Sequence, residues 1–299
     1  EKMSRVLISG GFFDQTIGLL TIIERTADGL VVVSDNEIEH PKPQISVVGK
    51  GITGIAIDGD YVWACFSNII AKIRISDFVI VDTIEDKHFN DLHEITLHNN
   101  QLYVANTGYE SVDIIDLATK RIERIDLLGE NIRKNRPEYT QDQDTKPHLH
   151  HISSITIDDN ENIILGMVRQ QRILNLTKWE WIGTKHSSPV HDVDFIDGKI
   201  WFTTVGGLIS NSETTWNLAD YQSEIGWTRG LAVTHEGMFV GTTAIRESNH
   251  DYYKIITDSN TEKTGAKISF LDSLNREESI TIELNDSKNR KIFSIKLIQ

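Results

Sequence analysis

The segment DLHEITLHNNQLYVANTG, residues 91–108, contains two runs of alternating polarity joined by the polar pair Asn99-Asn100. This layout is the sequence signature of a β-hairpin. Four further segments have the same layout in the same phase: GITGIAIDGDYVWACFSN (51–68), HISSITIDDNENIILGMV (151–168), PVHDVDFIDGKIWFTTVGG (189–207) and TRGLAVTHEGMFVGTTAIRE (228–247). The hairpin is therefore the unit of an internal repeat.

The spacing of this repeat predicts the fold. A column of residues occupies the first inward-facing position of each first strand, at spacings of 40, 60, 38, 38 and 64 residues: Thr53, His93, Ser153, His191, Arg229 and Phe293. A period of about 40 residues is typical of propeller blades, which are four-stranded sheets. One unit is split, with its first strand at residues 291–297 and its other three strands at residues 5–11, 18–24 and 29–35.

We therefore expect an all-β, six-bladed β-propeller. Its ring is closed by a C-terminal first strand joined to three N-terminal strands, which removes free sheet edges. The 299 residues include 39% hydrophobic and 25% charged residues, which is sufficient for one large core. The sequence shows no linker, so residues 1–299 are predicted to form a single β-propeller domain.

Charge and cysteine content limit the possible partners. The formal net charge is -14 and Lys and Arg do not cluster, which argues against nucleic acid and anionic membrane surfaces. The one cysteine, Cys65, excludes an intrachain disulfide, and no apolar run is long enough to span a membrane. A cytoplasmic location is the default expectation, although a leader removed ahead of Met3 stays open. The sequence gives no signal for oligomeric state.

Two insertions stretch the repeat, at residues 128–150 and 244–266. Residues 128–150 lead into a first strand, and residues 244–266 join a second strand to a third strand. In a propeller both loop types lie on the face where the first strands begin, which we call the top face. Polar insertions over that face predict a lid or a specificity rim.

Three histidines lead into the first strands of successive blades. His93, His151 and His191 are therefore expected to approach one another at the ring axis. Three neutral imidazoles could hold one divalent metal, Zn, Mn, Fe or Cu, with an open position for catalysis. The alternative is that these side chains bond to neighbouring backbone or to water.

A second interpretation needs no metal. His93 and His191 could act as acid and base, while Arg229 binds an anionic group and stabilises developing negative charge. Arg246 is expected on the same face as a second anion-binding group.

Three more residues are candidates for substrate binding. Asn106 and Thr204 end second strands, where they could orient sugar hydroxyls, and Trp227 could stack on a sugar or ring. Asn and Thr at strand ends are also common turn residues, so a structural role stays open.

The chain resembles an uncharacterised bacterial family of six-bladed propellers. The resemblance depends on NDLHEITLHNNQLYVANTG, SSPVHDVDFIDGKIWFTT, GWTRGLAVTHEGMFVGTTAIRE and KIFSIKLI, which contain the family's histidine strand starts and its T-R-G-L-A motif. It places four residues on motif positions and His151 where the family tends to have a histidine; the four are His93, His191, Arg229 and Arg246. The chain departs from the family at Ser153-Ser154 and Thr203-Thr204, where Asn-Gly and Asn-Ser are usual. The resemblance implies the fold and the site, but no reaction.

Together these features predict a top-face axial pocket that binds a polar, anionic small molecule or sugar derivative. An enzyme is favoured, a lyase, hydrolase or transferase that uses histidine acid/base or histidine–metal chemistry. The alternative is a non-catalytic scaffold that binds carbohydrate or docks a protein.

Overall fold

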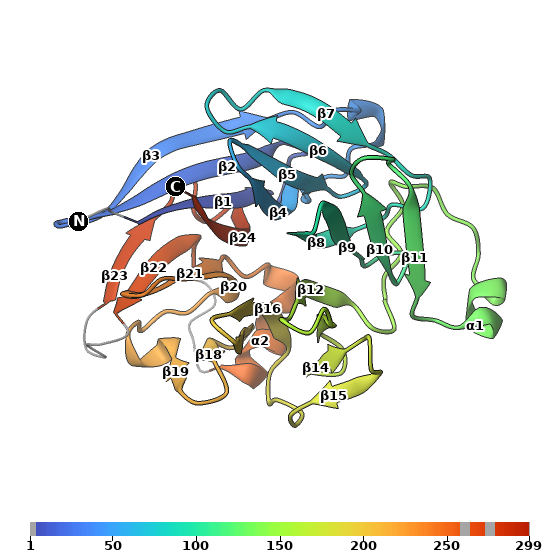
Figure 1. The fold of residues 1–299 in the computed structure, drawn as a ribbon. Helices are drawn as coiled ribbons and strands as arrows, with labels where there is room; N and C mark the ends of the chain where they lie inside the picture. The colour runs from blue at the N-terminus through green and yellow to red at the C-terminus, as the bar shows by residue number, and fades with distance from the viewer. Residues whose placement is uncertain (1–3, 258–263, 273–278, 299) are drawn as a thin grey trace.

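The computed structural model describes residues 4–257, 264–272 and 279–298, whose strands form six four-stranded antiparallel sheets around a ring (Figure 1). We number these sheets as blades in chain order and give their strands from the axis outward. Blade 1 contains β4 (Ile52–Asp58), β5 (Tyr61–Phe66), β6 (Ile69–Arg74) and β7 (Ile80–Ile84). Blade 2 contains β8 (Leu92–His98), β9 (Gln101–Asn106), β10 (Ser111–Asp116) and β11 (Ile122–Asp126). Blade 3 contains β12 (Ile152–Ile157), β13 (Ile163–Met167), β14 (Arg172–Asn175) and β15 (Glu180–Ile182).

The second half of the ring repeats this plan and confirms the predicted six-bladed propeller. Blade 4 contains β16 (Val190–Ile196), β17 (Lys199–Thr204), β18 (Leu208–Ser210) and β19 (Thr215–Asn217). Blade 5 contains β20 (Trp227–Val233), β21 (Gly237–Thr243), β22 (Lys267–Asp272) and β23 (Ser279–Glu283).

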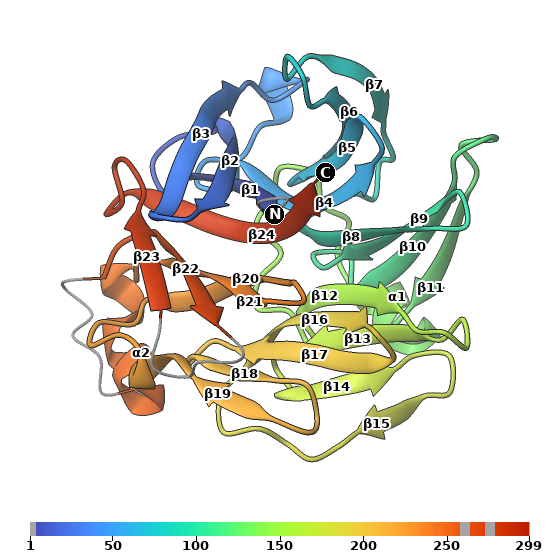
Figure 2. The same ribbon diagram turned by 60° about the vertical axis from the view of Figure 1, so that its left-hand side comes forward.

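Blade 6 closes the ring as predicted, because it combines both ends of the chain. Its order is β24 (Arg290–Ile298), β1 (Arg5–Phe12), β2 (Gly18–Thr26) and β3 (Gly29–Ile38). β1 pairs antiparallel with β24, so Arg5 at the start of β1 lies beside Ile298 at the end of β24 (Figure 2). Arg290, at the start of β24, donates to both carboxylate oxygens of Asp35 at 2.7 Å and to Thr21 Oγ1 at 2.6 Å. This buried arginine joins the innermost strand to the two outer ones.

The apolar core lies between the blades. Each of the six interfaces between neighbouring blades has its own cluster of buried aliphatic and aromatic side chains. Between blades 5 and 6, for example, Phe239 and Phe270 pack against Val6 and Ile292. Hydrophobic burial therefore holds each blade to both neighbours, which is possible only if the ring is closed.

All six inner strands contain a β-bulge at the same level. The pairing of each inner strand with the next strand of its blade shifts at the column residue, at Thr53, His93, Ser153, His191, Arg229 and Phe293. A bulge leaves backbone groups unpaired and redirects side chains. The whole column thus lies where the ladder is interrupted.

Hydrogen bonds at these bulges connect every blade to the next. Thr53 Oγ1 donates to the Leu92 carbonyl at 2.7 Å, and Ser153 Oγ donates to the Val190 carbonyl at 3.1 Å. In three further links a hydroxyl on or just after a second strand donates to an inner-strand carbonyl: Thr107 to Ile152, Thr243 to Ile292, and Ser9 to Thr53. In the sixth link the Gly230 amide donates to the Asp192 carboxylate. Six links therefore run around the ring without a gap.

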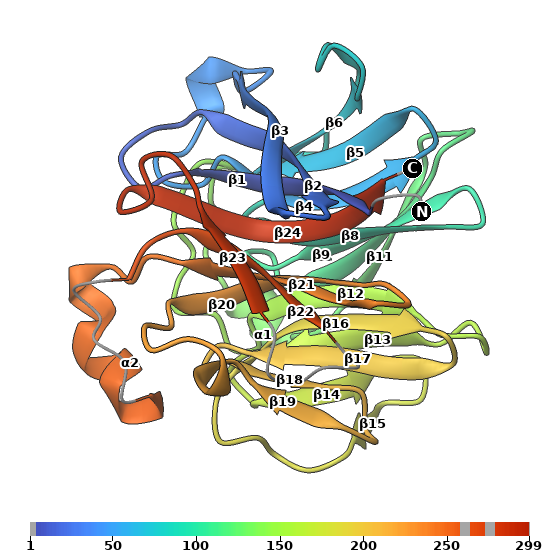
Figure 3. The same cartoon turned by 90° about the vertical axis from the view of Figure 1, so that its left-hand side faces the viewer.

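The helical segments lie outside the sheets. Two short α-helices, α1 (Glu130–Asn135) and α2 (His250–Ile256), lie in the two insertions, and three 3₁₀ turns are formed by Pro43–Ile45, Leu218–Asp220 and Glu247–Asn249. Helix α2 lies at the opposite end of the strands from the termini (Figure 3). Residues 258–263 of the second insertion lie outside the described residues. No helix in the described part of the chain is long and apolar enough to cross a membrane.

Replacing Arg290 by methionine tests the closure of blade 6. Arg290→Met leaves the half-buried Asp35 carboxylate with its hydrogen bond from Thr21 but without a counter-charge, so we expect the free energy of unfolding in urea to fall by about 2–3 kcal/mol.

The control is Arg74→Met, because Arg74 pairs with Asp77 on the surface, where both side chains are about 40% exposed. This change should cost less than about 1 kcal/mol. Equal losses in the two variants would contradict a closing role for Arg290.

Candidate functional site

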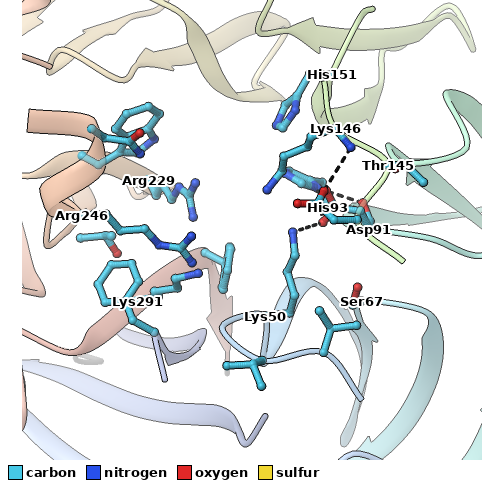
Figure 4. Close-up of a pocket in the computed structure, with 18 of the residues that line it drawn as sticks. Lys50, Ser67, Asp91, His93, Thr145, Lys146, His151, Arg229, Arg246 and Lys291 are labelled. Atoms are coloured by element: carbon cyan, nitrogen blue, oxygen red, sulfur yellow. Dashed lines mark hydrogen bonds and ion pairs between the residues drawn. The ribbon is translucent and has the colours of Figure 1, made fainter. Parts of the chain in front are cut away.

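A cavity of about 270 Å³ lies at the top-face end of the ring. The starts of β8, β20 and β24 line it together with parts of both insertions. Its polar side chains form two groups that face each other (Figure 4). We call Arg229, Arg246 and Lys291 the arginine wall, and Lys50, Asp91, His93 and Lys146 the aspartate wall.

The arginine wall is held by aromatic rings. The Arg229 Cζ lies 5.0 Å from the centre of the Phe293 ring, and the Arg246 Cζ lies 5.0 Å from that of Phe13. Within residues 4–257, 264–272 and 279–298, no carboxylate forms an ion pair with either arginine or with Lys291. Arg229 Nε is buried without a hydrogen-bond partner. Aromatic faces orient cations without neutralising them, so this wall keeps its positive charge.

Protonation differs within the arginine wall. Burial lowers the pKa of Arg229 to about 10, and burial also lowers the pKa of Arg246. Both guanidinium groups stay charged at neutral pH. Burial, and then the charges of Arg246 and Arg229, lower the pKa of Lys291 to about 5. Lys291 is therefore a neutral amine at pH 7.

The aspartate wall is internally paired. Lys50 donates to Asp91, which is buried and adopts a φ of 48°. Burial alone would raise the pKa of Asp91, but Lys50, with a smaller effect from His93, lowers it well below its usual range. The carboxylate is thus ionised and fixed beside His93.

The position of the proton on His93 follows from its contact with Asp91. His93 Nδ1 lies 3.0 Å from the main-chain oxygen of Asp91, and a carbonyl can only accept, so Nδ1 holds the hydrogen. Burial lowers the pKa of His93 to about 3, although Asp91 opposes this shift. His93 is therefore neutral, and its Nε2 keeps a lone pair.

A hydrogen-bond chain fixes the neighbouring His151 in the same way. Thr145 Oγ1 donates to Asn90 Oδ1, so His148 Nε2 donates to Thr145 and His148 Nδ1 accepts from His151 Nδ1, each at 3.0 Å. Burial lowers the pKa of His151 well below its usual value. The His93 and His151 rings lie edge to face with centroids 4.7 Å apart. Two neutral imidazoles with free Nε2 atoms thus lie side by side.

The structure gives no support for the predicted metal site. Among the described residues, no group of three or more His, Cys, Asp or Glu side chains is placed to hold a metal ion. His93 and His151 line the cavity, whereas His191 does not. His191 Nδ1 lies 3.5 Å from Asp192 Oδ1 instead. The set His93, His151 and His191 is therefore not assembled around a position for Zn, Mn, Fe or Cu.

Of the residues predicted to bind substrate, Arg246 and Trp227 line the cavity, but Asn106 and Thr204 do not. Asn106 is fully buried, and its amide donates to the His88 carbonyl and to Asp113. Thr204 Oγ1 accepts from the Leu208 amide. Both side chains therefore make the local contacts of turn residues.

Sequence reasoning missed six charged lining residues: Lys50, Asp91, Asp142, Asp144, Lys146 and Lys291. A signal for two of them was present, because Asp91 and Lys291 each lie two residues before the column, as do His151 and Trp227. Side chains two apart on a strand share a face, so this position forms a second layer above the column. Lys50 and Lys146 come from loops and follow no such rule.

One residue after the column, another layer contains acidic groups. Glu94 Oε1 accepts from the amides of Ile55 and Ile95 at 3.2 and 3.0 Å, and Oε2 accepts from Ser294 Oγ at 3.0 Å. Ser294 belongs to blade 6 and Glu94 to blade 2, so this contact passes blade 1 at Gly54. A methyl group on Gly54 would lie 2.6 Å from Glu94 Oε1, so the glycine makes room for the carboxyl group. Burial raises the pKa of Glu94 to about 7.

Comparisons with known proteins show the fold and no family. No protein-family model matches the chain, and no curated protein matches its sequence. Among solved structures, a protein of unknown function from Bacteroides caccae has a TM-score of 0.64 at 11% identity, with all of both chains covered. A chain from a nidogen/laminin complex has a TM-score of 0.63 at 9% identity, with 99% of this chain and 98% of that chain covered.

Virginiamycin B lyase from Staphylococcus aureus is a third similar structure, with a TM-score of 0.53 at 13% identity over 95% of this chain and 89% of the lyase. These identities show a shared propeller fold alone. The sequence resemblance to a bacterial propeller family stays a prediction.

The raised pKa of Glu94 predicts a pH dependence of stability. Between its ordinary pKa of 4.5 and about 7, the folded protein binds more protons at Glu94 than the unfolded chain does. The free energy of unfolding should therefore fall as pH rises from 5 to 8, by up to about 3 kcal/mol from this group. Glu94→Gln cannot ionise and should remove this fall, as measured by urea unfolding at both pH values.

The neighbouring charges do not titrate in this window. Burial lowers the pKa of Lys296, but Asp194 and Glu94 raise it above 10.5, while His191 outweighs burial and lowers the pKa of Asp192 below 3.8. Parallel pH dependences in wild type and variant would show that Glu94 is ionised throughout.

Proposed function

We propose that the top-face cavity binds a small molecule with a carboxylate, phosphate or sulfate group, which Arg229 and Arg246 hold. The observation that supports this is a pair of guanidinium groups, Arg229 half-buried with its Nε buried and unpartnered and Arg246 exposed, neither of which forms an ion pair with a carboxylate of the described residues. A buried charge without a partner is costly, and a fork of N–H donors matches the oxygens of such anions. A sugar derivative with an acidic group fits this description, with Trp227 beside Arg229 as a face for its ring.

We further propose that the bound anion undergoes acid–base chemistry. His93 is neutral and oriented by Asp91, so its Nε2 can accept a proton from the ligand or from a water molecule. Arg229 then stabilises the negative charge that develops. His151 lies against His93 and takes the second histidine role that the sequence assigned to His191. Proton removal beside a carboxylate followed by loss of a leaving group is a lyase reaction, which this arrangement favours over hydrolysis or group transfer.

The second candidate is a non-catalytic propeller that docks a protein. One structural neighbour comes from a nidogen/laminin complex, which is the observation in its favour. Such a scaffold would bind through blade surfaces or insertions and would tolerate substitutions in the cavity. The experiments below separate the two candidates.

Replacing the two arginines tests the anion site. Phosphate, sulfate and citrate should each raise the melting temperature of the wild type, and Arg229→Gln with Arg246→Gln should weaken citrate binding more than tenfold by calorimetry. In buffer without these anions, the double variant should be at least as stable as the wild type, because it lacks two unpaired cations.

The matched control is Arg121→Gln, since Arg121 is exposed at the surface of blade 2. It should leave the response to anions unchanged. If Arg121→Gln lowers citrate affinity as much as the cavity variants do, the binding is non-specific.

His93→Gln tests the base. For any carboxylated or phosphorylated compound found to be turned over, kcat should fall by about 10²–10⁴ while the dissociation constant changes by less than about threefold. Because the pKa of His93 is about 3, kcat/KM of the wild type should not fall between pH 8 and pH 6. Unchanged turnover in His93→Gln would show that His93 is not the base.

A further inference from the structure

Lys291 is the one amine of the arginine wall, and binding of an anion does not require it. It is 6% exposed, lines the cavity at the start of β24, and donates to the main-chain oxygen of Gly49. Its Nζ lies 4.9 Å from the centre of the Phe13 ring and 5.6 Å from that of Phe293. No carboxylate in the described ranges forms an ion pair with it. The amine is thus buried, and neither an acid nor bulk water stabilises its charge.

Arg246 and Lys291 converge on one point of the cavity. Gly49 adopts a φ of 76°, and a methyl group on it would lie 3.1 Å from Arg246 Nη2 and 3.6 Å from Lys291 Nζ. The absence of a side chain at Gly49 lets both groups reach the same space. A ligand in the adjoining cavity could therefore contact the guanidinium group and the amine at once.

The surroundings keep this amine unprotonated at neutral pH. Burial is the largest cause of its lowered pKa, and Arg246, Arg229, Lys50 and Lys146 add to the effect. A neutral amine donates one hydrogen to Gly49 and keeps its lone pair. Lysines placed in this way, desolvated and next to other cations, are nucleophiles toward carbonyl carbons.

We propose that Lys291 forms a reversible imine with the carbonyl carbon of a 2-oxo acid whose carboxylate is held by Arg229 and Arg246. This inference rests on the anion site proposed above and names its ligand class. Arg246 and Lys291 line the same side of the cavity, which suits a ligand whose acid and carbonyl groups are on adjacent carbons (Figure 4).

The step balances without a further reactant. The Nζ lone pair forms the C–N bond while the π electrons of the C=O bond move to oxygen, and a proton passes from nitrogen to that oxygen. The C–O bond of this carbinolamine then breaks, and one water molecule leaves as the C=N bond forms. The imine withdraws electrons from the next carbon, whose proton His93 can then accept more readily. Hydrolysis by water reverses the sequence and restores the lysine.

Reductive trapping tests this inference. The full chain is incubated at about pH 6.5 with millimolar pyruvate and cyanoborohydride, and labelled lysines are mapped by mass spectrometry. At this pH fewer than about one in a thousand ordinary lysines are neutral, so we expect Lys291 to be labelled at least tenfold more than any exposed lysine. Lys134 and Lys185 are internal controls, because both are exposed. Labelling should fall only as pH approaches 5.

Two variants separate this inference from the anion site. Lys291→Met should lose the label but keep the rise in melting temperature with citrate, whereas Arg229→Gln with Arg246→Gln should lose both. Labels spread over surface lysines, or a wild type that binds citrate but is not labelled at Lys291, would overturn the imine and leave the anion site standing. A wild type that responds to neither citrate nor pyruvate would overturn both proposals.

Discussion

The structure depends on a set of hydrogen bonds that link neighbouring blades at the level of the inner-strand bulges. At this level the antiparallel ladder of every blade is interrupted, and the freed backbone groups bond to side chains of the adjacent blade. Because the links form a complete ring, each bulge is held from both sides. The same bulges place His93 and Arg229 at the axis. The feature that closes the propeller therefore also builds its cavity, and the two cannot be varied independently.

The charges on the two walls of the cavity are stabilised in different ways. On the aspartate wall, Lys50 neutralises Asp91, and the fixed carboxylate and its backbone orient His93. On the arginine wall, aromatic rings position the cations without neutralising them. A protein with a net charge of -14 has many carboxylates available for pairing, and none of those in the described ranges forms an ion pair with Arg229 or Arg246, although Asp144 lines the same cavity and acts on Arg246 electrostatically. The excess of positive charge is thus local, and the fold maintains it against the charge of the whole molecule.

Local patterns in the sequence were sufficient to predict the fold. Alternating polarity located the four strands of blade 6, including the separate β24, because strand pairing has a strict period of two residues. The site was harder to predict, since alternation reveals which face a residue is on but not its depth along the axis. His191 shares a column with His93 and still does not line the cavity. The Asn106 and Thr204 side chains bond to neighbouring residues of their own blade, and the spacing of the repeat does not reveal this orientation. Lys50 and Lys146 reach the cavity from loops, and only the folded ring brings them near Asp91.

The contact between Glu94 and Ser294 lies below the top-face cavity and bears on how a ligand reaches it. It joins blade 2 to blade 6 past blade 1. The cavity shares no lining residue with a second cavity, which is lined by residues that include Ile95, Leu231 and Lys296. The two cavities are therefore lined by separate sets of residues. If the upper cavity binds an anion, as we propose, the two insertions that line it would control how a ligand reaches Arg229 and Arg246.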